Sequence, residues 1–247
     1  MLILLVVASW TRHEGILCLV VVSLVAARDG EAGQHLRAGI DAAEMLNLAE
    51  ICLVPAVNPD GLDLVTGALK DGNWFERALS IAGQYPFITF PDGWKANISG
   101  VDLNLQYPAG WEQGKDIKFA QGFTGPAPRD YVGALPLSAP ESRALYQLTL
   151  SFDPAATLSY HTQGNVIYWK YLNLEPEGSK DLAERLGEVS GYAVEQTPYA
   201  SGFAGYKDWF ILNYDRPGYT IEAGLGSNPL PIAQFEKIYA QNIGILA

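Results

Sequence analysis

The sequence predicts a single α/β domain over residues 1–247, with a central mixed, mostly parallel sheet that helices cover on both faces. Three observations predict this class. Several short apolar runs lack any alternation of polar and apolar residues, as strands buried on both faces do. Helical segments of about 10 to 15 residues lie between these runs, which is typical of βαβ units. The composition, 49% hydrophobic and 17% charged without repeats, is that of a globular protein.

The N-terminal part predicts two buried strands, at residues 2–8 and, with the sequence "ICLVPAV", at 51–57. Between them, residues 16–27 predict a core-facing helix, and residues 33–48 have helical composition. The apolar runs are shorter than the roughly 20 residues that cross a membrane, and no basic region precedes the first as in a signal peptide. We therefore expect a buried strand and a core-facing helix here, with a membrane-anchored N-terminus as the alternative.

The rest of the chain continues the alternation of strands and helices. The segment 67–128 differs, because it is rich in Gly, Pro, Asn and aromatic residues and has little periodicity, so we expect a functional loop region there. The predicted strands are 156–160, 166–169 and 218–222, and the predicted helices are 140–148, 179–191 and 231–243.

Charge and cysteine content exclude some functions. The formal net charge is −11 and the chain has no Lys/Arg cluster, which argues against a nucleic-acid partner. Cys18 and Cys52 both lie in apolar runs, where a cysteine usually behaves as a buried thiol, although a disulfide between them stays open.

Few residues are candidates for chemistry. Of the three histidines, His35 is interpreted as a surface residue, whereas His161 follows a predicted strand and is either a metal ligand or base, or a structural histidine. Glu222 ends a predicted strand before a Gly-rich turn and is either a general base or a solvated strand end. The "NPDG" sequence at 58–61 predicts a turn. Asn104 follows Asp102 in "GVDLNLQ".

The order of these motifs carries more information than any one of them. "RHEG" after the first strand is followed by "VNPDG", "GVDLN", "SYH" and finally "TIE" before "GSNPLP". This order resembles the M14 zinc carboxypeptidase family over essentially the whole chain. "HTQGNVIYW", "AGYKDWFI", "RPGYTIEAGLGSNPLP" and "PDGWKANISGVDLN" look like its bacterial branch of γ-D-glutamyl-meso-diaminopimelate peptidases.

The resemblance implies one zinc ion, held by a His-x-x-Glu pair and a distant His. Glu14 matches the Glu of the pair, and His161 matches the distant His. The position three before Glu14 is Thr11, whose neutral hydroxyl is a poor zinc ligand, so weaker metal binding is expected. His13 is the nearby substitute for the missing imidazole.

The resemblance also implies the catalytic and substrate-binding residues. Glu222 matches the general base, and Lys95, nine before Asn104, matches an Arg that polarises the scissile carbonyl. Asn104 matches the Asn of an Asn-Arg pair that clamps a terminal carboxylate. Leu105 stands at the Arg position and cannot hold a carboxylate, which disfavours a plain C-terminal carboxypeptidase.

Two further features follow from the resemblance. Tyr199, with Tyr206 as its neighbour, lies near the position of a mobile Tyr that caps the substrate; a packed aromatic is the alternative. Relatives carry additional strands before the strand at 2–8. We therefore expect either that this sequence is truncated at its N-terminus relative to the family, or that its sheet lacks the N-terminal edge strands.

These implications define one leading function and two alternatives. The leading hypothesis is a zinc metallopeptidase that hydrolyses the γ-D-glutamyl-diaminopimelate amide bond of peptidoglycan stem peptides with a metal-activated water. The alternative is a catalytically impaired M14 pseudo-enzyme that binds cell-wall peptides, because Thr11 replaces the expected His. A third possibility is a deacylase acting on a small amide. The expected partner is a peptide or peptidoglycan fragment, the expected location is the cytoplasm or cell envelope of a bacterium, and the oligomeric state stays open.

Overall fold

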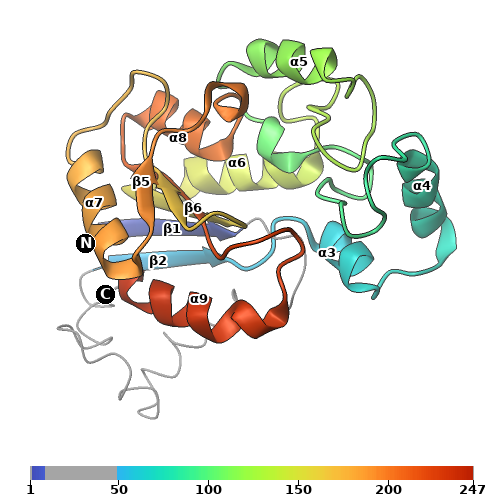
Figure 1. The fold of residues 1–247 in the computed structure, drawn as a ribbon. Coiled ribbons are helices and arrows are strands. Elements are labelled where there is room, and N and C mark those ends of the chain that lie inside the picture. Colours follow the sequence, from blue (N-terminus) through green and yellow to red (C-terminus); the bar gives the residue numbers. More distant parts are fainter. Residues whose placement is uncertain (1, 9–48, 247) are drawn as a thin grey trace.

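The computed structural model describes residues 2–8 and 49–246, and these form a six-stranded sheet with helices on both faces (Figure 1). Along the sheet the strand order is β2-β1-β3-β6-β4-β5. Every neighbouring pair is parallel except β4 and β6, so the predicted mixed, mostly parallel sheet is confirmed. The strands are β1 (Leu2–Ala8), β2 (Ala49–Val54), β3 (Ala156–His161), β4 (Val166–Tyr168), β5 (Ala193–Glu195) and β6 (Gly218–Glu222).

Two hydrophobic clusters hold the helices against the two faces of the sheet. One cluster joins β3, β4 and β6 to α7 (Ser179–Ser190) and α9 (Phe235–Asn242). The other packs α6 (Pro140–Phe152) and α8 (Tyr206–Tyr214) on the opposite face. Helices therefore cover both faces of the sheet, as the sequence predicts.

Strand β3 carries a polar row through this buried sheet. All six of its residues are buried. Leu158 and Tyr160 belong to the cluster of α7 and α9. Because side chains alternate along a strand, Thr157, Ser159 and His161 lie on the other face. The row ends with His161 at the carboxyl end of the strand, which is where the candidate site begins.

Most predicted elements recur close to their predicted bounds. Strand β6 has the predicted bounds, while β3, β4, α7 and α6 differ by one to four residues. The helix predicted at 231–243 is divided into a 3-10 turn, Ile232–Gln234, and α9. The helices predicted at 16–27 and 33–48 lie outside the described residues. Cys52 is a free, half-buried thiol, and Cys18 lies outside the described part.

Three expectations need correction. The segment 67–128 contains α4 (Gly72–Ala82), α5 (Trp111–Ala120) and a 3-10 turn at Leu103–Leu105. "NPDG" begins α3 (Pro59–Thr66), because Asn58 caps the helix by accepting from the Gly61 N–H at 3.1 Å and Pro59 fits its first turn. The strand predicted to reach residue 57 ends at Val54.

The helices α3, α4 and α5 lie beyond the carboxyl ends of β1 and β2 (Figure 1). This is the end of a parallel sheet at which α/β proteins form their sites. None of the helices among the described residues is both long and apolar enough to cross a bilayer.

Candidate active site

The sheet brings His161 and Glu222 together. Both residues end parallel neighbouring strands, β3 and β6, and the two are paired in register. Glu222 is also opposite Val166 on the antiparallel strand β4. Two residues that are 61 positions apart in the sequence are therefore neighbours at one edge of the sheet, where both line the same cavity.

His161 is held as a neutral imidazole. Its residue is 8% exposed, and burial lowers the pKa to about 4, with the positive charge of Lys95 acting in the same direction. The carboxylate of Asp102 opposes both effects. A neutral imidazole has a free nitrogen lone pair at physiological pH, which is what a metal ligand or a general base requires.

Glu222 is shifted in the direction that suits acid-base chemistry. Burial raises the pKa of its carboxyl to about 7, and Lys95 opposes part of this rise. A carboxyl with a pKa near neutrality can both accept and return a proton during one reaction cycle. Because its carboxyl is buried at the end of the strand, Glu222 is not a solvated carboxylate.

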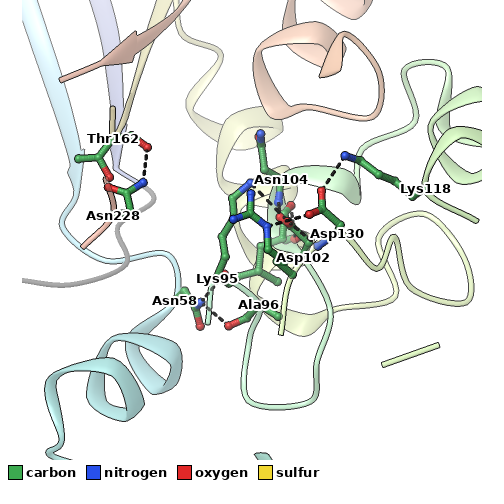
Figure 2. A network of polar contacts seen from close by, with 12 residues as sticks. Asn58, Lys95, Ala96, Asp102, Asn104, Lys118, Asp130, Thr162 and Asn228 are labelled. Atoms are coloured by element: carbon green, nitrogen blue, oxygen red, sulfur yellow. Dashed lines mark hydrogen bonds and ion pairs between the residues drawn. The ribbon is translucent and has the colours of Figure 1, made fainter. Parts of the chain in front are cut away.

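Lys95 lies on a loop that is tied to the rest of the site through its backbone. The N–H groups of Lys95 and Ala96 both donate to the carbonyl of Pro128, at 2.7 and 2.9 Å. The side chain of Asn58, which also caps α3, donates to the Ala96 carbonyl at 2.9 Å (Figure 2). Lys95 Nζ contacts Asp102 Oδ2 at 3.3 Å, and this carboxylate raises the pKa of the ammonium. Lys95 therefore stays charged beside the site.

Asp102 and Asn104 form the wall behind Lys95. Asp102 is 1% exposed and accepts from the backbone N–H of Asn104 at 3.2 Å, which fixes the 3-10 turn that carries Asn104. Asn104 itself lines the cavity. Figure 2 shows Lys95, Asp102 and Asn104 gathered together, with Thr162 and Asn228 on the opposite side of the view.

The cavity has a volume of ≈ 560 Å³, large enough for a short peptide. Four residues that the sequence singles out line it together: Lys95, Asn104, His161 and Glu222. The sequence reasoning missed four further charged residues in its walls: Asp92, Arg129, Lys207 and Asp208. Lys207 and Asp208 lie within the quoted "AGYKDWFI". Two adjacent charged residues in an otherwise apolar segment could have indicated that both are buried and paired.

The two tyrosine candidates have different positions. Tyr199 is 71% exposed on a 3-10 turn and contacts the Phe203 ring edge to face, with centroids 5.0 Å apart. It does not itself line the cavity, but Pro198 and Ser201 on either side do. Tyr206 is 3% exposed and exchanges a hydrogen bond of 2.9 Å with Thr149, so it is a core residue.

The remaining predicted metal ligands, Glu14 and His13, lie outside the described residues, as does Thr11. The last described residue of strand β1, Ala8, pairs with Tyr160, the residue before His161. The described residues contain no group of three or more His, Cys, Asp or Glu side chains that could hold a metal. They supply one neutral imidazole, that of His161, of the kind that zinc binds.

Comparisons with known proteins agree with this geometry. The family model described as zinc carboxypeptidase matches residues 36–243. The gamma-D-glutamyl-L-diamino acid endopeptidase 1 of Lysinibacillus sphaericus is 45% identical over 207 residues, which are 84% of this chain and 50% of that protein. The chain thus spans about half the length of this relative.

Solved structures share the fold at lower sequence identity. The carboxypeptidase A of Helicoverpa armigera superposes with a TM-score of 0.61 at 15% identity, covering 99% of this chain and 60% of that one. The murein-tripeptide amidase MpaA of Escherichia coli O157 superposes with a TM-score of 0.53 at 21% identity, covering 100% of this chain and 81% of that one. These two likenesses are evidence for the fold.

Proposed function

The chain belongs to the zinc carboxypeptidase family, and we propose that it hydrolyses the amide bond between a γ-D-glutamyl group and a diamino acid in peptidoglycan stem peptides. One observation carries the proposal: a neutral imidazole, His161, and a carboxyl with a pKa of about 7, Glu222, lie side by side in one cavity. The substrate class is taken from the relative of 45% identity, whose name states that specificity.

The metal would be held by His161 together with residues of the undescribed segment. By the family resemblance these are Glu14 and, in place of the histidine that Thr11 replaces, His13. When bound, zinc supplies Lewis acidity, which polarises a carbonyl and lowers the pKa of water. The low pKa of His161 fits this role, because its nitrogen need not lose a proton before it binds a metal.

Glu222 moves the protons of the reaction. In its ionised form it accepts a proton from the attacking water, and in its neutral form it returns that proton to the leaving amine. A carboxyl with an ordinary pKa would be too weak a base to do the first step efficiently. The pKa of about 7 allows both steps near neutral pH.

Lys95 and Asn104 orient the substrate and stabilise developing charge. Lys95 Nζ is held by Asp102, and its side chain is 33% exposed, so the ammonium can reach an oxygen that becomes negative. Asn104 offers an amide group to the same cavity from a turn that Asp102 fixes. Both residues are thus positioned before substrate arrives.

A second candidate function is peptide binding without hydrolysis. Thr11 favours it, because losing one imidazole from a three-ligand site should weaken zinc binding strongly. The cavity and its charged lining would still accept a stem peptide in that case.

Metal content and hydrolysis, measured on the same preparation, separate the two functions. The protein is purified without chelator, its zinc is quantified by mass spectrometry, and it is incubated with L-alanyl-γ-D-glutamyl-meso-diaminopimelate. Stoichiometric zinc and release of diaminopimelate support the peptidase. Absence of both contradicts it, and recovery of both in Thr11→His would support the impaired, binding-only protein.

A further inference from the structure

An ion-pair network of three cations and two carboxylates reaches the cavity, because two of its members, Lys95 and Arg129, line the cavity wall. Figure 2 shows Lys95, Asp102, Lys118 and Asp130 of this network. Asp102 contacts Lys95, with 3.3 Å between Oδ2 and Nζ. Asp130 accepts from Lys118 Nζ at 2.6 Å and from Arg129 Nε at 2.8 Å. The Asp130 N–H donates to Asp102 Oδ2 at 3.1 Å and so joins the two halves. Three positive and two negative formal charges leave one positive charge without a counter-charge within the network.

The geometry places this surplus charge on Arg129. The side chains of Lys95 and Lys118 are 33% and 13% exposed, and each ammonium is set against a carboxylate. The Arg129 side chain is 47% exposed, uses only Nε in the network and shares Asp130 with Lys118. A guanidinium has five N–H donors, so the edge formed by its two terminal nitrogens can still bind a carboxylate in bidentate fashion.

The backbone around Arg129 is fixed on both sides. The Pro128 carbonyl accepts from the N–H groups of Lys95 and Ala96, and the Tyr131 carbonyl accepts from the Asp102 N–H at 2.9 Å. Asp130 adopts a left-handed conformation with φ 66°, which the surrounding hydrogen bonds hold in place. Arg129 therefore presents its side chain from a fixed loop, which lowers the entropy lost on binding.

Lys207, which also lines the cavity, is already paired with a carboxylate. Lys207 Nζ contacts Asp208 Oδ1 at 2.6 Å and donates to the Lys170 carbonyl at 2.7 Å, and both side chains of the ion pair are 4% exposed. Leu105, at the position where the family resemblance implies an Arg, is buried in a small cluster with Trp111. Neither of these positions offers a cation to a substrate carboxylate.

We propose that Arg129 binds a free carboxylate of the peptide substrate and so selects acidic peptides. This inference rests on the proposed function, since it assigns a specificity-determining residue to the same cavity. A γ-linked glutamyl group keeps its α-carboxylate free on the acyl side of the scissile amide, which an ordinary α-linked residue does not. The diamino acid carries further carboxylates on the amine side. Both sources present the same planar, bidentate acceptor to Arg129.

The experiment compares Arg129→Gln with the wild type on three peptides. These are L-alanyl-γ-D-glutamyl-meso-diaminopimelate, its analogue with the glutamyl α-carboxyl amidated, and its analogue with the diaminopimelate carboxyls amidated. Values of kcat/KM are measured, and binding of each peptide is followed by calorimetry. The control is Arg77→Gln, an exposed arginine of α4 that lies over the Trp74 ring and does not line the cavity.

On the fully acidic peptide we expect Arg129→Gln to lose about 10- to 100-fold in affinity and in kcat/KM, mainly through KM. One amidated analogue should be bound equally by the wild type and Arg129→Gln, and this analogue identifies the recognised carboxylate. The Arg77→Gln control should behave as the wild type on all three.

Equal losses on all three peptides, or no loss at all, would overturn the assignment. If the wild type binds these peptides without cleaving them, the proposed hydrolysis fails while the calorimetry still decides on Arg129. If the wild type binds none of them, the assignment fails as well.

Discussion

Glu222→Gln is the substitution that most directly tests the electrostatics of the site. Burial raises the pKa of this carboxyl from 4.5 to about 7, whereas in the unfolded chain it is expected to keep the ordinary value. At 1.36 kcal/mol per pH unit, the difference of about 2.5 units corresponds to about 3 kcal/mol of unfolding free energy. Gln is close in shape to the protonated carboxyl but cannot ionise.

The sign follows from which state holds the proton. Between pH 4.5 and 7 the folded protein keeps the Glu222 proton while the unfolded chain has lost it, so this group's contribution to stability decreases as pH rises. The pKa of His161 is lowered to about 4, so the contribution of this residue to stability increases as pH rises towards 6.5. In the wild type this increase partly hides the decrease that Glu222 causes. Because His161 is present in both proteins, the difference between Glu222→Gln and the wild type isolates Glu222.

We expect the unfolding free energy of Glu222→Gln, minus that of the wild type, to increase by about 3 kcal/mol from pH 4.5 to 8 in metal-free protein. Urea denaturation with chelator present measures it, followed by the fluorescence of the six tryptophans. Glu112→Gln is the control, because that side chain is 73% exposed and should give a flat difference. If the difference in unfolding free energy between Glu222→Gln and the wild type also stays constant with pH, burial does not raise the pKa of Glu222 and the reasoning is refuted.

Three other substitutions test separate parts of the site. Asp102→Asn should lower the unfolding free energy by about 2 to 4 kcal/mol in urea denaturation, because Lys95 then loses its buried counter-charge; the exposed Asp116→Asn should change it by less than about 0.5 kcal/mol. His161→Gln should lower the zinc retained after dialysis against limiting zinc, measured by mass spectrometry, and unchanged retention would exclude His161 as a ligand. Tyr199→Ala should leave the melting temperature unchanged, because the residue is exposed, while lowering kcat/KM on the acidic tripeptide; unaltered kinetics would remove Tyr199 from the site.

The fold was predictable where the pattern of apolar residues reflects burial on both sides of the sheet. The strands β1 and β2 follow from such runs, although β2 ends at Val54 and not at residue 57. Helix α8 was not predicted, because Tyr206 to Ile211 are all buried and leave no polar stripe from which a helical period can be recognised. In α4 and α5, Gly72 and Gly114 contributed to the impression of a long loop, but tertiary contacts override such weak local preferences.

The site was predictable to the extent that it is built from strand ends. His161 and Glu222 lie at the ends of predicted strands. Once the order of the strands in the sheet is known, it follows that the two residues are neighbours at one edge. Lys95 came only from the family resemblance, and Asn104, which the sequence offered as a candidate, received its role only from that resemblance. Arg129 could not be found from the sequence, because its role depends on a hydrogen bond between Asp130 and Asp102, 28 residues apart in the chain.

Burial is the largest cause of the pKa shifts of both His161 and Glu222, although the two shifts have opposite directions. Desolvation disfavours the charged form of any group, so it removes the proton from His161 and keeps the proton on Glu222. Lys95 lowers both pKa values and therefore cannot be the cause of their separation. Between pH 4 and 7 both groups are neutral, and above pH 7 only Glu222 gains a charge, a negative one beside a free imidazole. A cation is then favoured at this sheet edge, so zinc binding to His161 should strengthen through neutral pH whichever ligands residues 9–48 provide.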